Sequence, residues 1–158
     1  MIENAALQRY SLFGGLLPEQ IQAISSLLGQ ESYAAGEIIQ KEGDPNDKIR
    51  FILEGRVSVT KASLLLIELG EGDTFGEMEI LDVMPSAATV RAEVPVAVAV
   101  ISNRTIRQLY KLDTQAFALI MMNLARDLSR RLRRMDELRC REVGGTSPVM
   151  APGQAASF

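Results

Sequence analysis

Residues 74–92, TFGEMEILDVMPSAATVRA, contain the side chains with the clearest potential for binding chemistry. Gly76 precedes two carboxylates, Glu77 and Glu79, and Pro85 then leads into small residues and a strand. A glycine before a short helix is typical of a cradle in which backbone N–H groups bind an anion. No lysine or arginine follows Gly76 before the strand, so the cradle lacks the cation that an anion site would be expected to have.

The residue types that the chain lacks exclude most catalytic chemistry. Its 158 residues include no histidine and one cysteine, Cys140. Nucleophile systems that need histidine and histidine-ligated zinc or haem sites are therefore excluded. A lone cysteine forms no internal disulfide and is typical of a reducing compartment. Because no paired acids and no metal-ligand cluster stand out either, we predict that the protein is not an enzyme.

Length and composition indicate one domain that does not enter a membrane. Hydrophobic residues make up 47% of the chain and charged residues 23%, which is ordinary for a globular protein. The longest strongly apolar run, at 94–101, is far shorter than the roughly 20 residues of a membrane-spanning helix. The N-terminus has no basic stretch followed by an apolar core, so it does not resemble a secretory signal. We expect a cytoplasmic location.

Periodicity predicts flanking helices around a β-region. Residues 1–30 are expected to be helical, with Pro18 in a first turn and Gly29 at a helix end. Residues 31–101 consist of short apolar runs divided by turn residues, which predicts an all-β barrel or sandwich. The expected strands lie within 36–47, 49–61 (two, around Gly55), 64–75 and 89–101 (two, interrupted at Pro95). Residues 102–142 are expected to be helical, with one long helix from about Thr114, and 143–158 to form a flexible tail.

These features, in this order, resemble the cyclic-nucleotide-binding domain, and most closely the sensor domains of bacterial catabolite-activator and FNR-type regulators. The resemblance runs from about Leu12 to Leu138. It implies a β-roll of the double-stranded β-helix or jelly-roll type with a long C-terminal helix. The segments that carry it are Gly43-Asp44, Ile52-Leu53-Glu54-Gly55, Gly72-Asp73, Phe75-Gly76-Glu77 and Pro85 with Ala87-Ala88-Thr89-Val90.

The resemblance implies a role for each residue of the cradle. Gly76 would let the backbone approach a ligand, Glu77 would accept hydrogen bonds from a ribose 2′-hydroxyl, and 77–81 would form a short helix. Ala87 would donate its backbone N–H to a cyclic phosphate. The residues expected to contact a ligand are Phe75, Gly76, Glu77, Met78, Ser86, Ala87, Ala88 and Arg131.

The sequence departs from the family pattern at Ser86, where the family has an arginine that pairs with the phosphate. A serine donates one neutral hydrogen bond, whereas a guanidinium donates a charged pair of roughly twice the strength per bond. Arg91 lies too far along the strand to replace it. Glu79 adds a carboxylate that either repels an anion or points outward. The departure disfavours cAMP and cGMP, and it leaves three alternatives: cyclic-nucleotide binding, another small ligand, or a closed pocket with Phe75, Met78, Ile80 and Leu81 as core.

The long helix carries an apolar seam with steps of three and four, which is typical of a helix that pairs with another. In the resembled family this helix forms a two-fold dimer interface and covers the nucleotide base. The residues expected in a homodimer interface are Phe117, Met121, Leu124, Leu128, Leu132, Met135 and Leu138. Arg131 interrupts the seam, and its side chain can pair with an acid, face a pocket or extend to solvent, the last being the commonest behaviour.

We interpret the chain as a non-catalytic regulatory domain that transmits ligand or partner binding through a dimeric C-terminal helix. The alternative is a ligand-free interaction or dimerisation module that has lost nucleotide binding. The expected partners are a second copy, a small anionic or nucleotide ligand and an unidentified protein. Direct DNA binding is not expected, because the family's DNA-binding members carry a helix-turn-helix domain after the long helix and only 16 residues follow Glu142 here.

Overall fold

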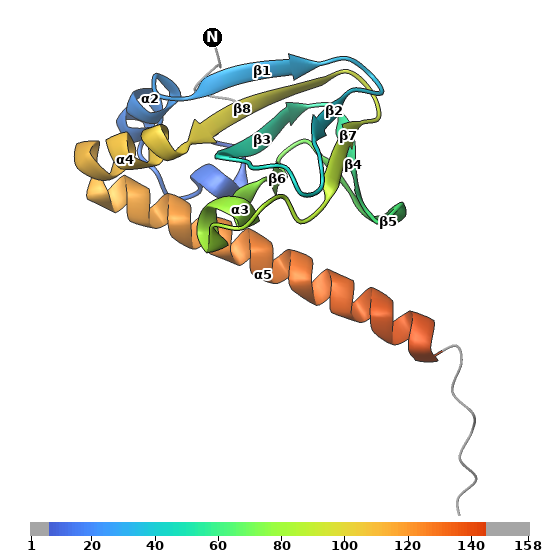
Figure 1. Cartoon of the computed structure of the whole chain (residues 1–158). Helices are drawn as coiled ribbons and strands as arrows, with labels where there is room; N and C mark the ends of the chain where they lie inside the picture. The colour runs from blue at the N-terminus through green and yellow to red at the C-terminus, as the bar shows by residue number, and fades with distance from the viewer. Residues whose placement is uncertain (1–6, 145–158) are drawn as a thin grey trace, which may run out of the picture.

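The computed structural model describes residues 7–144, which form a β-roll with helices packed along one side (Figure 1). Two four-stranded antiparallel sheets, in the orders β1-β8-β3-β6 and β2-β7-β4-β5, make up the roll. This architecture confirms the predicted fold. The strands are β1 Gly29–Tyr33, β2 Ile38–Gln40, β3 Lys48–Glu54, β4 Arg56–Lys61, β5 Leu64–Gly70, β6 Thr74–Phe75, β7 Thr89–Ala92 and β8 Val96–Ser102.

Helices precede, interrupt and follow the strands. They are the 3-10 helix η1 Ser11–Phe13, α2 Pro18–Ser25, α3 Glu77–Asp82, α4 Asn103–Leu112 and α5 Thr114–Gly144. Pro18 opens α2 as predicted, and the side chain of Ser102 caps α4 by accepting from the backbone N–H of Thr105 at 3.1 Å. Within residues 7–144, no helix combines the length and the apolar character needed to cross a membrane.

The structure corrects the predicted N-terminal region. The helix expected to end at Gly29 ends at Ser25, and Gly29 instead begins β1 opposite Val100 of β8. A Cβ on Gly29 would lie 3.3 Å from the Val100 Cβ, so this glycine permits close strand pairing. Pairing with a strand some 70 residues away leaves no local periodic signal. Residues 1–6 and 145–158, which include most of the predicted tail, lie outside the described residues.

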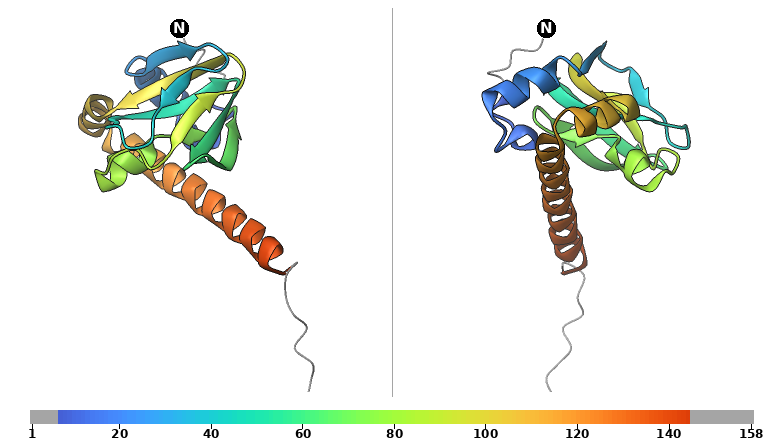
Figure 2. Two further views of the ribbon diagram at one scale, coloured as in Figure 1. Left: turned by 45° about the vertical axis from the view of Figure 1, so that its right-hand side comes forward. Right: turned by 90° about the vertical axis from the view of Figure 1, so that its left-hand side faces the viewer.

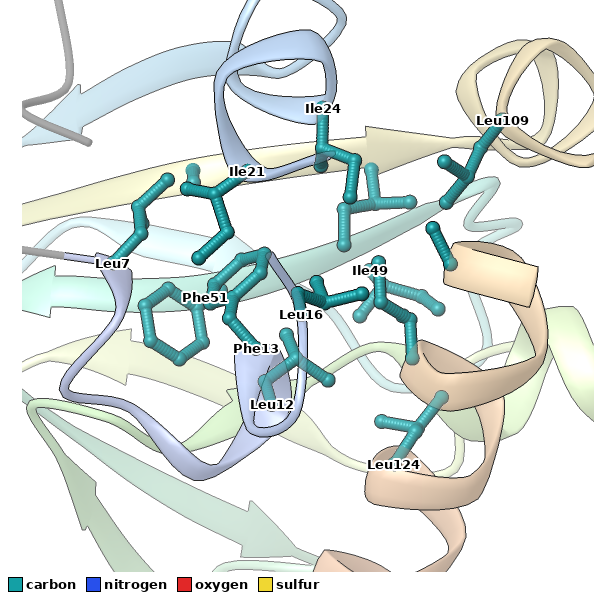
Figure 3. Packing of buried hydrophobic residues seen from close by; sticks show 14 residues of the cluster. Leu7, Leu12, Phe13, Leu16, Ile21, Ile24, Ile49, Phe51, Leu109 and Leu124 are labelled. Atoms are coloured by element: carbon teal, nitrogen blue, oxygen red, sulfur yellow. The ribbon is translucent and has the colours of Figure 1, made fainter. Parts of the chain in front are cut away.

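The buried apolar side chains form two clusters. One lies between the β1-β8-β3-β6 sheet and the helices and includes Phe13, Phe51 and Leu124 (Figure 3). The other fills the interior of the roll between the two sheets and includes Val57 and Phe75. The helices are therefore part of the core and not appendages to it.

The first half of α5 is fixed to the body, whereas its second half projects away from it (Figure 2). Ala116, Ile120 and Leu124 are buried in the helix-side cluster. Asn123 is also buried, and its Nδ2 donates to the backbone oxygens of Leu12 at 3.1 Å and Gly14 at 2.9 Å.

A polar network braces the face of the roll next to the predicted cradle. The Glu31 carboxylate accepts from Lys48 Nζ at 2.8 Å, from Arg50 Nε at 3.0 Å and from the Tyr33 hydroxyl. Burial alone would raise the pKa of Glu31, but the hydrogen bonds from Lys48, Tyr33 and Arg50 outweigh it and lower the pKa to about 2. Arg50 Nη1 also donates to Asn46 Oδ1 at 3.1 Å, which links the network to the turn before β3.

We predict that Glu31→Gln removes an acid-sensitive part of the stability. The lowered pKa means that Glu31 stabilises the fold above about pH 4.5 and loses this contribution as the pH falls towards about 2. Urea denaturation over this range should show the gap between wild type and Glu31→Gln closing on acidification. The exposed Glu68→Gln is the control. A gap that does not change with pH would contradict the assignment.

Candidate functional site

Gly76 joins β6 to α3 in a conformation that its neighbours require. Its φ is +80°, and a Cβ on it would lie 2.5 Å from the Lys48 backbone oxygen and 2.8 Å from Asn46 Nδ2. Asn46 Nδ2 donates to the backbone oxygens of both Lys48 and Gly76, at 2.8 and 3.2 Å. Lys48 and Asn46 of the same chain thus leave no room for a Cβ at Gly76, whereas the approach of a ligand to its backbone stays a prediction.

The segment after α3 is held by the turn that precedes β3. Ser86 donates its backbone N–H to the Asp44 oxygen at 2.9 Å and accepts from the Gly43 N–H at 2.8 Å. Its side chain is buried, and its Oγ has no hydrogen-bond partner. Arg91 is exposed and donates to the Gly36 oxygen at 3.2 Å, so it does not supply the missing cation, as expected.

Glu79 lies inside the cradle. It is 7% exposed, and its Oε1 accepts from the Ala87 backbone N–H at 3.1 Å and from Gln40 Nε2 at 3.0 Å. The outward orientation considered for Glu79 is therefore wrong. The Ala87 amide, which the resemblance assigned to a phosphate, already binds a carboxylate of the same chain.

Glu77 and Arg131 connect the cradle to the long helix. Arg131 Nη1 donates to Glu77 Oε1 at 2.8 Å, and its Nη2 donates to the Thr74 backbone oxygen at 2.6 Å. Glu77 is only 2% exposed. Burial raises its pKa, the Arg131 charge partly offsets this, and the nearby Glu79 charge raises the pKa further. The expectation that Arg131 extends to solvent is wrong, because an acid and a carbonyl oxygen lie within its reach.

A cavity of about 400 Å³ lies between the β4-β5-β7 face of the roll, α3 and α5. Of the eight residues predicted to contact a ligand, all but Ser86 line it. Met78 and Leu81 are exposed, so they do not close the roll as core residues. Most of the other lining side chains are apolar: Val59, Leu66, Ile67, Leu69, Val90, Leu128, Leu132 and Met135. The arrangement brings the predicted residues together around one space, and their contact with a ligand stays a prediction.

Several buried acceptor oxygens of this region have no partner. They are Gln40 Oε1, Glu77 Oε2 and Glu79 Oε2, all from residues that line the cavity. Unpaired acceptors in a buried site lose hydration without regaining a hydrogen bond, which is unfavourable. A hydrogen-bond donor that reached these oxygens would therefore offset that cost.

The predicted dimer seam divides into two parts. Leu124 is 2% exposed in the core of its own domain, so we leave it out of the interface, which corrects the sequence-based assignment. Phe117, Met121 and Leu128 also pack partly against that core. Leu132 and Leu138 are exposed and Met135 is half-buried, so these three remain available to a partner.

Sequence reasoning missed the site roles of Gln40, Asn46 and Thr74. Asn46 lies in the turn at residues 43–47, which begins with Gly43-Asp44. These residue types predict a turn but not the hydrogen bonds that Asn46 makes to the cradle. Gln40 lines the cavity from the end of β2, where the register with β7 is irregular, and no local pattern predicts that position. Thr74 acts through its backbone oxygen, and no residue type signals that contact.

A sequence model of the cyclic nucleotide-binding domain matches residues 30–113. Among curated proteins, Glutaminase 2 of Bradyrhizobium diazoefficiens is 34% identical over 131 residues, which are 82% of this chain and 21% of that protein. A CRP-like cAMP-activated global transcriptional regulator of Mycobacterium tuberculosis is 33% identical over 135 residues, 81% of this chain and 58% of the regulator. The chain thus spans less than two thirds of each.

Solved structures show the same architecture. A cyclic nucleotide-binding domain from Methylobacillus flagellatus superposes with a TM-score of 0.79 at 25% identity, covering 93% of this chain and 84% of that one. Because the superposition covers 93% of this chain, it includes most of the roll and much of the long helix.

We predict that Gly76→Ala is more destabilising than Gly36→Ala. Both glycines have a positive φ, +80° and +85°, but a Cβ at Gly36 would meet nothing within 4 Å. The control therefore carries only the backbone strain of about 1–3 kcal/mol, and Gly76→Ala adds the clash with Lys48. Urea denaturation measures both. Equal losses of unfolding free energy would mean that the cradle accommodates the methyl group.

We also predict that Arg131→Met costs about 3 kcal/mol of unfolding free energy and exceeds the cost of Glu77→Gln. Removing Arg131 leaves a buried carboxylate without its charge partner, whereas Arg131 without Glu77 is 18% exposed at its side chain and can reach water. Arg130→Met, which alters an exposed arginine beside it, is the matched control. If Arg131→Met and Arg130→Met are equally stable, the ion pair does not hold α5 to the cradle.

Proposed function

The chain belongs to the cyclic nucleotide-binding domain family, and we propose that it is a non-catalytic regulatory domain whose cavity controls the position of α5. Relatives in the family include regulators that respond to cAMP, according to their names.

Among the described residues, no group of three or more His, Cys, Asp or Glu side chains could hold a metal ion. The non-catalytic role is part of the proposal, and product formation from cAMP would contradict it. We keep the predicted cytoplasmic location as part of it.

One observation carries this proposal, namely the contact of Arg131 with the cavity wall. Its guanidinium donates to the carboxylate of Glu77, the first residue of α3, and to the backbone oxygen of Thr74 in β6. Arg131 follows Leu128, which packs partly against the helix-side core, and it precedes the projecting end of α5. A change at Glu77 is therefore transmitted to the projecting half of the helix.

The mechanism we propose has two states of α5. In one, Arg131 holds the helix against Glu77 and Thr74, and Leu128, Leu132 and Met135 form one wall of the cavity. A ligand that contacts Glu77 or these apolar side chains changes the free energy of that state relative to one with α5 displaced. The shift requires that the ligand bind the two states with different affinity.

We further propose that the projecting half of α5 forms a homodimer. Leu132, Met135 and Leu138 present apolar surface there, and apolar side chains on a projecting helix gain free energy when a second helix covers them. The same surface would suit an unidentified protein partner. We propose that the domain acts through one of these contacts rather than through direct DNA binding.

A ligand-free dimerisation module is the second candidate, and Glu79 favours it. Its carboxylate takes the Ala87 amide, so one anion-binding donor of the cradle is already satisfied within the chain. Thermal unfolding in the presence of ligands separates the two functions, because only a ligand-binding domain gains stability with ligand concentration.

The most direct test of the proposed mechanism uses Cys140, the chain's single cysteine, which is exposed on α5. Spin labels at Cys140 in a dimer report the distance between the two helix ends. Arg131→Met should shift or broaden this distance distribution, whereas Arg130→Met should not. An unchanged distribution in Arg131→Met would contradict the coupling.

We predict that Leu138→Glu weakens the dimer and Met122→Glu does not. Both side chains are about half exposed, at 51% and 53%, but Met122 lies on nearly the opposite side of the helix and in the anchored half. Placing a charge in a helix–helix seam should raise the dimer dissociation constant at least tenfold, as measured by sedimentation velocity. Equal dissociation constants for the two variants would place the dimer contact elsewhere.

A further inference from the structure

The polar end of the cavity is rich in acceptors, because three of the described residues that line it each have a buried side-chain oxygen without a partner. Glu79 and Gln40 are 7% and 8% exposed, and each has a buried side-chain oxygen with no partner. Glu77 Oε2 is a third such oxygen, from a residue that is almost fully buried. Carboxylate oxygens only accept hydrogen bonds when ionised, and an amide oxygen always does.

Several donors of the cradle are already engaged within the chain. The Ala87 N–H and Gln40 Nε2 both donate to Glu79 Oε1. Both guanidinium contacts of Arg131 go to Glu77 and the Thr74 oxygen. Glu79 thus occupies the anion position of the cradle, and a second anion would meet its charge at short range in a buried site.

Lys61 is the remaining cationic side chain in the cavity lining, and it does not change this balance. It lies at the exposed end of β4, where solvent screens its charge, whereas Glu77 and Glu79 are buried. The buried end therefore holds two carboxylates against one guanidinium. The rest of the wall is largely apolar, from Val59 and Leu69 on the sheet to Leu132 on α5.

We propose that the cavity binds a neutral or cationic ligand that donates hydrogen bonds to Glu79 and Gln40 and places an apolar body against β4, β5 and α5. Hydroxyl or ammonium groups on a flat, weakly polar body meet these requirements, and a phosphate does not. This inference deepens the proposed function, on which it rests, by reversing the charge of the ligand that the fold would suggest.

Three probes that share one nucleoside body but differ in charge test this proposal by calorimetry on the full chain. They are cAMP with its phosphate anion, adenosine with free 3′ and 5′ hydroxyl donors, and 5′-amino-5′-deoxyadenosine with an ammonium group. We expect adenosine to bind at least tenfold more tightly than cAMP, and the amine to bind at least as tightly as adenosine. Binding of cAMP as tight as that of adenosine overturns the proposal, and so does the absence of binding by both adenosine and the amine at millimolar concentration.

Glu79→Gln identifies the acceptor. The variant keeps an oxygen for the Ala87 amide but replaces the unpartnered carboxylate oxygen by an NH₂ group, so the preference for the amine over cAMP should fall at least tenfold. Glu68→Ala removes an exposed carboxylate of β5 that does not line the cavity, and it controls for the change in net charge. If Glu79→Gln and Glu68→Ala change the preference equally, long-range charge explains it and the proposed contact is wrong.

The outcomes separate this inference from the proposed function. The distance between Cys140 labels responds to Arg131→Met without any ligand, so it tests the coupling alone. A response there with no preference for donor probes would overturn the ligand class and leave the regulatory role. Donor-selective binding without a response of the label distance would overturn the regulatory role and leave the ligand class.

Discussion

The contact of Arg131 with Glu77 and Thr74 determines how the rest of this structure can work. It joins residues 54 and 57 positions apart in the sequence, one on the long helix and the others on the cavity wall. Because Glu77 is buried, losing the cation is destabilising: it leaves a carboxylate without a charge partner where water cannot reach it. The cradle and the helix therefore share one interaction, and the coupling that we propose rests on it.

The cradle itself is recognisable in its backbone and altered in its charge. Gly76, the short α3 and the Ser86 loop are in place, held by Asn46 and by the turn at Gly43 and Asp44. The carboxylate of Glu79 then satisfies the Ala87 amide from within. Family membership therefore establishes the fold of this site, while the identity of its ligand has to be argued from the side chains that are present here.

Much of the fold could be predicted from the sequence, because turn residues such as Gly55 and Gly72 mark where strands end. The strand at Gly29 could not, since its extended form depends on pairing with Val100. In the site, the positions were predictable and the contacts were not. By residue type alone, Glu79 is expected to repel an anion or point outward, and extension to solvent is the commonest of the three behaviours open to Arg131. Glu79 is instead buried, and Arg131 is largely covered, each against partners that only the folded chain brings near.

Amide hydrogen exchange would test the central claim, that α5 and the cavity wall are coupled, by changing α5 and measuring the effect on α3. Coupling is reciprocal, so loosening α5 at Arg131 must loosen α3. Exchange of the α3 amides in Arg131→Met should rise relative to the core strands β3 and β8, while Arg130→Met leaves it unchanged. If α3 exchanges no faster than in wild type once global stability is taken into account, the long helix and the cavity act independently and the account is wrong.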